Sequence, residues 1–217
     1  MFNGIQGNGN VITDNRTPSE NFTKIKVSNG LDLHVSQGNE TKVVVEADEN
    51  LHDIIFTEVR DGELRIYAEK NIWNAESRKV HVTLNTLESI QATSGADVHS
   101  EEVITTNQIY LSATSGADIR FQVQANEVRT DATSGADIKI SGETEKHNTN
   151  ASSGASINAY DLKSKTVNAN VSSGADINVY ASEAIYANAS SGGDIDFKGN
   201  PKKEDRNASS GGSISKK

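Results

Sequence analysis

The sequence predicts an all-β fold: a right-handed parallel β-helix, or β-solenoid, of about seven coils of 18–21 residues, preceded by an N-terminal strand and hairpin region that caps it. Three observations predict this. A seven-residue phrase recurs at near-constant spacing, apolar and polar residues alternate within each repeat, and aromatic residues make up only 5% of the 217 residues. So few large side chains suit a narrow core built from small residues.

The repeated phrase has the form Ala-Thr-Ser-Gly-Ala-Asp-Ile, as at residues 113–119, with Ser in place of Thr in the later copies. Leucine-rich repeats share the period but need several Leu in every unit, and helical repeats are longer. Stacked strands are therefore the architecture that fits. The central glycines are 21, 19, 19, 20, 18 and 19 residues apart, at Gly95, Gly116, Gly135, Gly154, Gly174, Gly192 and Gly211.

Within each repeat the apolar period is two, which is the period of a strand with alternate residues facing inward. This parity predicts an inward set of Ala, Ser and Ile, including Ala113, Ser115 and Ile119, and an outward set of Thr and Asp. Gly116 marks the corner of the coil, because Gly adopts backbone angles that other residues avoid. Stacking then places a Thr/Ser column beside an Asp column.

The N-terminal half is also strand-like. Residues 1–19 are expected to form a loose arm or an edge strand, residues 20–90 a strand and hairpin region, and residues 91–217 the solenoid, which is expected to be continuous with 20–90 as one structural unit. Asn29-Gly30 and Asp61-Gly62 are hairpin signals and predict antiparallel pairs that lead into the solenoid. Residues 48–54 are expected to form a short turn or one helical turn.

Composition excludes several classes of function. The net charge is −9 with a pI near 5.0, and Lys and Arg are dispersed among acids, so nucleic acid is not an expected partner. There is no Cys, hence no disulfide or thiolate site, and no apolar stretch of membrane-spanning length. The first ten residues lack the features of an export signal, so the protein is either cytoplasmic or a mature segment whose signal was removed.

An acidic column is the first candidate site. Carboxylates stacked on successive coils repel one another, and Ca²⁺ could bridge them. The simpler interpretation, which we favour, is that each Asp satisfies amides at its corner and keeps the sheet soluble. Ser156 and Ser213 interrupt the column. Its members are Asp97, Asp118, Asp137, Asp176 and Asp194.

An aromatic pair is the second candidate site. Tyr160 and Tyr180 both lie six residues after the Gly of their coil, which predicts that they stack on one outer face and could pack against a sugar ring. The alternative is an aromatic pair that only stabilises the sheet. Tyr110 and Tyr186 share another offset several coils apart. An Asn column is also expected, with its amides stacked to stabilise the coils, at Asn150, Asn170, Asn188 and Asn207.

No catalytic pattern is present. The five His follow no metal-ligand spacing, and there is no nucleophile elbow, phosphate loop or dinucleotide fingerprint. Polysaccharide-active β-helix enzymes use acids in a cleft built by long inserted loops, and the constant repeat length leaves no room for such loops. The sequence therefore predicts a protein that is not an enzyme and needs no cofactor. A regular Thr array for ice binding is equally disfavoured, because most of the column is Ser.

The chain also resembles a known family. The opening GNGNVITDNR (7–16), the block FTKIKVSNGLDLHVSQGNETKVVVEADENL (22–51), the segment DGELRIYAEK (61–70) and the serial SGAD phrases are similar to the putative auto-transporter adhesin, head GIN domain family. The resemblance implies a β-helical, exported protein of Bacteroidota, in the periplasm or at the outer membrane or cell surface, often a lipoprotein. It implies no catalytic residues and no established ligand.

Together these observations predict a non-enzymatic cell-envelope β-solenoid that acts as an adhesin, a binding module or a structural spacer. Its partner is a glycan or a surface protein, and homo-oligomers could form through the faces or edges of the solenoid. A glycan-binding protein that uses the Tyr160 and Tyr180 face, and a polysaccharide-active enzyme, are the alternatives. This chain ends at Lys217 on a coil of Ser, Gly and Lys, without the amphipathic strands of an autotransporter barrel.

Overall fold

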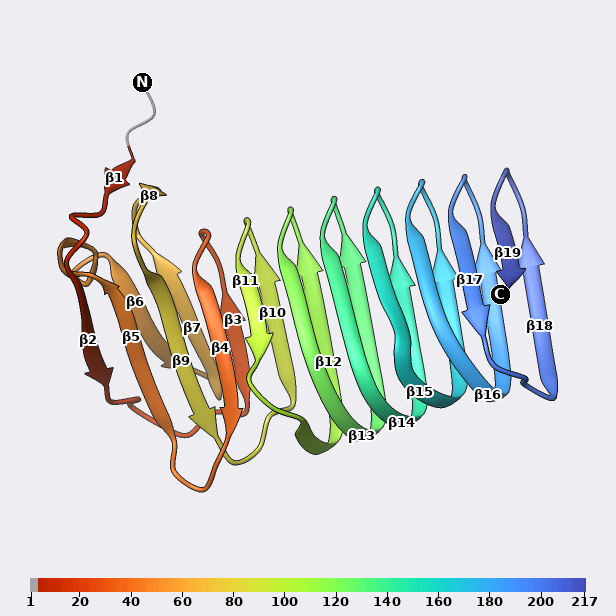
Figure 1. Cartoon of the computed structure of the whole chain (residues 1–217), viewed down its shortest axis with the longest axis horizontal. Coiled ribbons are helices and arrows are strands. Elements are labelled where there is room, and N and C mark those ends of the chain that lie inside the picture. Colours follow the sequence, from red (N-terminus) through yellow and green to blue (C-terminus); the bar gives the residue numbers. More distant parts are fainter. Residues whose placement is uncertain (1–3) are drawn as a thin grey trace.

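The computed structural model describes residues 4–217 and has the predicted all-β solenoid architecture, with tight turns aligned along one edge and wider bends along the other (Figure 1). Parallel strands stack coil upon coil, so that like residues face each other: Ala113 pairs with Ala132, and Ile119 with Ile138. Among the described residues no helix is long and apolar enough to span a membrane. The only helical element they contain is the 3₁₀ turn η1 (Glu49–Leu51), which falls in the predicted turn.

Each repeat coil is flattened and has two faces. After a tight turn the chain runs along one face, bends round the far edge and returns along the other face to the next turn (Figure 1). We call the outer surface of the strand segments that follow the tight turns the Asp face. The outer surface of the strand segments that precede the tight turns is the Asn face. The strands are β10 (Ser89–Thr93), β11 (Asp97–Ser100), β12 (Ile104–Thr114), β13 (Asp118–Thr133), β14 (Asp137–Ala151), β15 (Ser156–Val171), β16 (Asp176–Ala189), β17 (Asp194–Lys198), β18 (Lys203–Ala208) and β19 (Ser213–Lys216).

The Ser-Gly pair of the phrase forms the tight turn. Ser115 and Gly116 both have positive φ, 56° and 69°, and the Ala117 N–H donates to the Thr114 carbonyl at 3.3 Å. These are the features of a type I′ turn. The prediction that Ser115 faces inward is wrong: its side chain is exposed, because the left-handed backbone at the turn breaks the strand alternation. The other predicted inward residues, Ala113 and Ile119, are buried.

The core is a set of stacked rows. One row on the Asp side is almost entirely Ile, and each of its members from Val98 to Ile195 is at most 1% exposed. Since each inner residue packs on its equivalents in the neighbouring coils, β-branched side chains fill the interior without large aromatics. The row comprises Val98, Ile119, Ile138, Ile157, Ile177 and Ile195.

The solenoid begins earlier than the repeat suggests. Strands β3 (Lys24–Val27) and β4 (Asp32–Gln37) run parallel to β10 and β11, and the Gly30 N–H donates to the Ser94 carbonyl at 3.0 Å. The predicted antiparallel hairpin at Asn29-Gly30 is therefore wrong. Asn29 and Gly30 have positive φ, as at the coil turns, and this turn geometry serves a hairpin and a coil equally well.

The N-terminal end is closed by antiparallel strands. On the Asp side β4 continues through β9 (Arg78–Leu84) and β5 (Lys42–Asp48) to the edge strand β2 (Val11–Arg16). On the Asn side β3 pairs with β7 (Glu63–Ala68), which forms the predicted hairpin with β6 (Ile55–Arg60) around Asp61-Gly62. β1 (Ile5–Gln6) and β8 (Ile72–Asn74) form a small separate sheet. Residues 1–3 of the predicted arm lie outside the described part of the chain.

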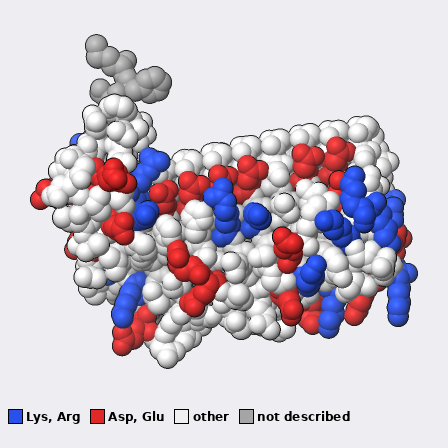
Figure 2. All heavy atoms as spheres, in the orientation of Figure 1, with Lys and Arg blue, Asp and Glu red and all other residues white. Residues whose placement is uncertain are grey.

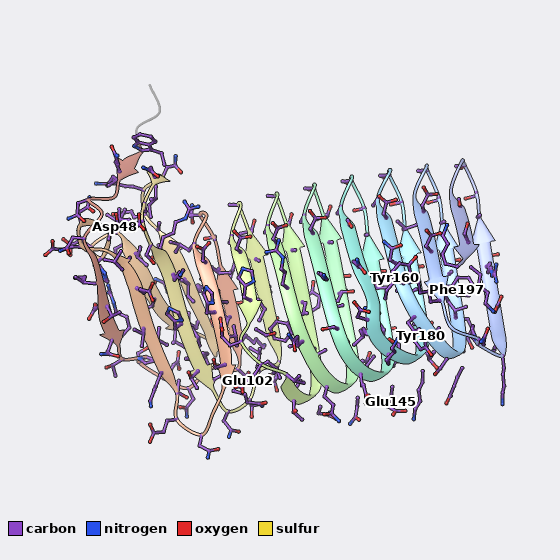
Figure 3. The ribbon with its side chains drawn as sticks, in the orientation of Figure 1. Asp48, Glu102, Glu145, Tyr160, Tyr180 and Phe197 are labelled. Atoms are coloured by element: carbon purple, nitrogen blue, oxygen red, sulfur yellow. The ribbon has the colours of Figure 1, made fainter. Side chains whose placement is uncertain are left out.

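The last coil carries charges at inward positions. Glu204 aligns with the buried Ile185, and Arg206 aligns with the buried Ala187. The Arg206 guanidinium lies 4.5 Å from the ring centroid of the buried Phe197 (labelled in Figure 3) and pairs with Glu204. Inward-pointing charges on an edge strand disfavour the addition of a further strand. The ion pair therefore covers the core where β18 ends the stack.

Candidate functional site

The Asp column forms as predicted and is longer than predicted. Asp97 aligns with Asp118 and Asp118 with Asp137, and Asp32 of the N-terminal half extends the column. Ser156 interrupts it before Asp176 and Asp194. Acidic side chains form a broken row below the uncharged turns (Figure 2).

The electrostatics of this column are repulsive. Burial, followed by the charges of Asp32 and Asp118, raises the pKa of the Asp97 carboxyl. Within residues 4–217 no group of three or more His, Cys, Asp or Glu side chains is arranged to hold a metal ion. Calcium binding by this column therefore stays a prediction.

Tyr160 and Tyr180 lie on neighbouring coils (Figure 3), but the predicted direct stacking is wrong. The register shifts between Ala159 and Lys163, so that Tyr180 aligns with Lys163. The extra residues of this coil form a bulge, which equal spacing from the Gly cannot reveal. The Lys163 ammonium lies 4.1 Å from the centroid of the Tyr180 ring, and Lys198 lies 4.2 Å from that of Tyr160. Their role as a sugar platform stays a prediction.

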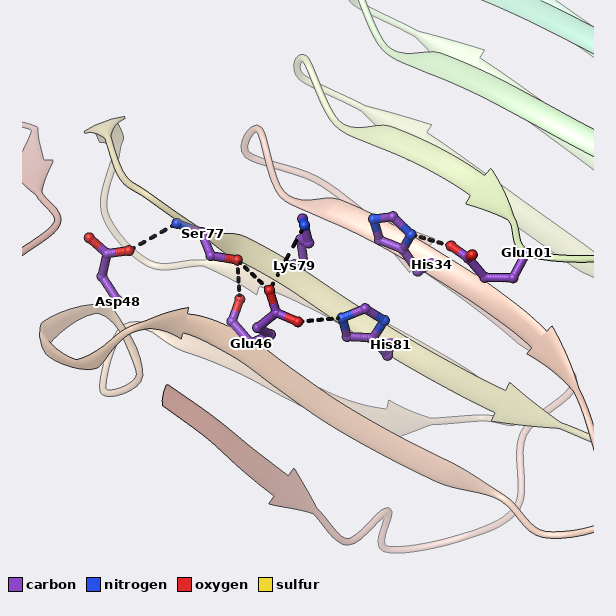
Figure 4. Close-up of polar contacts among 7 residues, drawn as sticks. All are labelled: His34, Glu46, Asp48, Ser77, Lys79, His81 and Glu101. Atoms are coloured by element: carbon purple, nitrogen blue, oxygen red, sulfur yellow. Dashed lines mark hydrogen bonds and ion pairs between the residues drawn. The ribbon is translucent and has the colours of Figure 1, made fainter. Parts of the chain in front are cut away.

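A row of three His crosses the Asp face and was not predicted. His81, His34 and His99 align on β9, β4 and β11, with ring centroids 5.1 Å and 5.4 Å apart. His34 pairs with Glu101, and the His81 Nε2 lies 3.1 Å from Glu46 (Figure 4). The hydrogen bond from His34 lowers the pKa of Glu101. Aligning NGLDLH (29–34) with SGADVH (94–99) would have paired His34 with His99 from the sequence, whereas the place of His81 depends on the pairing of β9 with β4.

A buried carboxylate holds the N-terminal arm. Asp48 is 1% exposed and accepts hydrogen bonds from the Ser77 N–H at 2.9 Å and the Gly9 N–H at 2.8 Å. Burial alone would raise its pKa, but the backbone N–H groups outweigh burial and lower it. Figure 4 shows the Asp48–Ser77 contact beside the contacts that Glu46 makes with Ser77, Lys79 and His81. The Asp48 carboxylate has a structural role, because it joins Gly9 of the arm to Ser77, which directly precedes β9.

A second buried polar group lies inside the repeat coils. His147 is fully buried in a row otherwise occupied by Val128 and Val167, and its Nε2 lies 2.9 Å from the Thr130 hydroxyl, which donates to Thr149. Its Nδ1 has no hydrogen-bond partner among the described residues. Burial lowers the pKa of His147 to about 3. An imidazole sealed in this way stays neutral and is out of reach of any substrate.

The predicted Asn column is confirmed on the Asn face. The Asn170 amide donates to Asn150 at 3.0 Å, Asn188 donates to Asn170 at 3.0 Å, and Asn207 donates to Asn188 at 3.3 Å. The column starts at Asp131, to which Asn150 donates at 2.6 Å. Each amide therefore fixes the orientation of the next.

A groove of about 860 Å³ runs along this column. It is lined on one side by the Asn column and on the other by the Thr/Ser column, and its lining residues come from six successive coils. The sequence predicted the two columns but not the hollow between them. Its outward polar side chains are Ser112, Asp131, Thr133, Asn150, Ser152, Asn170, Ser172, Asn188, Ser190, Asn207 and Ser209, whereas Arg206 lies at its end with its guanidinium turned toward Phe197.

Comparison with known proteins agrees with this architecture. A putative adhesin from Bacteroides fragilis superposes with a TM-score of 0.89 at 23% identity, covering 99% of this chain and 100% of that one. A putative lipid binding protein from Parabacteroides distasonis gives 0.80 at 22%, covering 98% and 99%. A putative adhesin from Parabacteroides merdae gives 0.74 at 16%, covering 99% of both chains.

These identities are low, so the likeness shows the fold alone. No curated protein matches the sequence. The family model of the putative auto-transporter adhesin, head GIN domain, matches residues 21–201, and the chain belongs to this family.

Proposed function

We propose that the protein is a non-catalytic binding module of the bacterial cell envelope that acts in adhesion. The observation that carries this proposal is the outer surface of the coils, where polar side chains recur in fixed columns and the groove on the Asn face is lined by amides and hydroxyls. Such a surface can bind a partner through many equivalent contacts. The lining of the groove holds one carboxylate, Asp131, and no His, Cys or Glu, whereas catalysis needs a converging acid, base and nucleophile.

The family and the relatives called adhesins support an exported location, with a lipoprotein anchor as the finer proposal. Lipid binding, the name given to one relative, has less support in this chain. The large apolar residues exposed in the described part are Val11, Ile12 and Trp73 in the N-terminal region and Val103 between β11 and β12. A lipid site would need a contiguous apolar surface.

Adhesion is testable with beads coated with the protein. Their retention under flow is measured on surfaces carrying immobilised bacterial and host polysaccharides or matrix glycoproteins, with albumin-coated beads as the control. We expect retention several-fold above the control on at least one surface. Equal retention on every surface would contradict the proposal and favour a structural spacer. Removal of the protein from intact cells by external protease tests the location.

A further inference from the structure

We infer that the groove on the Asn face binds a linear, uncharged glycan that lies along the solenoid axis. This inference rests on the proposed binding function and adds its ligand class and its site. The groove is formed by strand segments of successive coils that are paired to their neighbours, so its walls are part of the rigid scaffold.

The amides of the groove have unused hydrogen-bonding capacity. An Asn side chain offers two N–H donors and an oxygen with two acceptor positions. In the column, Asn170 uses one donor toward Asn150 and one acceptor position toward Asn188. One donor and one acceptor position therefore remain on an amide whose orientation is already fixed. Sugar hydroxyls both donate and accept, and fixed groups lose little entropy when they bind.

The charge of the groove favours a neutral ligand. Its only charged lining residues are Asp131 at one end and Arg206 at the other. Asp131 already pairs with Arg129 at 2.9 Å, and Arg206 pairs with Glu204. A phosphate backbone needs clustered Lys and Arg, which this lining lacks. A uronic acid polymer would meet the same lack of positive charge.

The backbone of the groove does not suit a peptide. Peptides that bind to sheets add a strand at a free edge or place side chains in apolar pockets. Except for the edge strand β18, the strands under the groove are hydrogen-bonded to coils on both sides, and Ser, Thr and Asn dominate the lining. A glycan instead repeats its hydroxyl pattern along its length, as the coils repeat theirs about every 4.8 Å.

Affinity electrophoresis tests the inference. The protein is run in gels containing dextran, laminarin, xylan or mannan as neutral probes and polygalacturonate as the acidic probe. We expect at least one neutral probe to retard the protein and polygalacturonate not to. The variant Asn170→Ala/Asn188→Ala is expected to bind that probe about tenfold more weakly, because two amide contacts are lost.

Three variants separate the possible outcomes. Ser172→Trp blocks the groove and leaves the Asn column intact, so it covers the case in which the double Ala variant fails to fold. Asn178→Ala changes an Asn on the Asp face of the coil that contains Asn188, aligned with Asn158, and must bind like the unchanged protein. Tyr160→Ala/Tyr180→Ala tests the aromatic pair.

Binding that persists in both groove variants, or that is lost only in the Tyr variant, overturns the inference and leaves the proposed function standing. The same holds if no neutral polysaccharide retards the protein while coated beads still adhere. Preference for polygalacturonate also overturns the inference. If the beads do not adhere either, the proposed function fails with it.

Discussion

The N-terminal region (residues 4–88) and the repeat coils (residues 89–217) use the same tight turn but are stabilised in different ways. Asn29-Gly30 and Asp61-Gly62 make the turns of the first region, and Ser-Gly pairs make those of the second. In the first, strands distant in sequence interleave, and single side chains such as Asp48 hold them together. In the second, each coil packs on a near copy of itself.

This difference separates positions that must be kept from positions that are free to vary. A side chain that joins distant strands has no substitute, because no second copy of the contact exists. An outward side chain in a coil is one of several equivalents, and its loss leaves the rest of the column in place. The outer faces of the coils can therefore acquire binding residues with little cost to the fold.

The largest expected effect is at Asp48. Replacing Asp48 by Ala leaves the N–H groups of Ser77 and Gly9 without their acceptor, which we expect to cost about 3 kcal/mol of unfolding free energy. The matched variant Asp118→Ala, in the partly exposed column, is expected to change it by less than about 0.5 kcal/mol. Urea denaturation at pH 7 measures both.

The pH dependence of the Asp48 variant provides a check. The pKa of Asp48 is lowered in the folded state, so its contribution to stability is fully present above the ordinary Asp range and is lost as the pH falls below that range toward the lowered folded pKa. The difference between Asp48→Ala and the unchanged protein should therefore shrink in acid. Equal losses at Asp48 and Asp118 would contradict the comparison of the two regions.

The second effect is at His147, where a coil departs from its neighbours. The pKa of His147 is about 3 in the folded protein and about 6.5 in the unfolded chain. The folded state therefore loses stability as the pH falls below 6.5. His147→Val matches Val128 and Val167 and should stabilise the protein by about 2 kcal/mol at pH 5 relative to its effect at pH 8. Thermal melts at both pH values measure this. A constant difference would show that His147 does not titrate as its burial requires.

A smaller gain is expected at the coil turns. Ser134 has a φ of 58°, and this left-handed conformation is less favourable for Ser than for Asn. The equivalent N-terminal turn has Asn at this position, Asn29. Ser134→Asn should stabilise the protein by about 0.5 kcal/mol. Asn29→Ser is the reciprocal variant and should destabilise by a similar amount. Two changes of the same sign would show that the turns are not equivalent.

The smallest expected effect is in the Asp column. The raised pKa of Asp97 means that its charged form disfavours folding at neutral pH and that the penalty is relieved as the pH falls. Asp97→Asn should raise the melting temperature slightly at pH 7 and have no effect in strong acid. Melts with millimolar calcium test the metal hypothesis. We expect no shift, and a rise that Asp97→Asn abolishes would assign calcium to the column.

Much of the fold could be predicted because the repeat couples sequence to register. A period of two identifies Ala113 and Ile119 as inward residues, and equal spacing identifies the Asn column. Prediction failed where a local conformation overrides parity, as at Ser115, or where a bulge changes the register, as between Ala159 and Lys163. Asn29-Gly30 misled because its turn is the same in a hairpin and in a coil. The groove could not be predicted, because its shape depends on the path of the packed strands, which the spacing of residues in the sequence does not reveal.

The central functional claim is that recognition occurs in the groove of the Asn face. A crystal structure of the protein soaked with oligosaccharides from whichever neutral polysaccharide binds in gels tests it most directly. The account predicts density for a chain of sugars beside Asn170 and Asn188, along the solenoid axis. Density over Tyr160 and Tyr180 on the Asp face, with an empty groove, would contradict it.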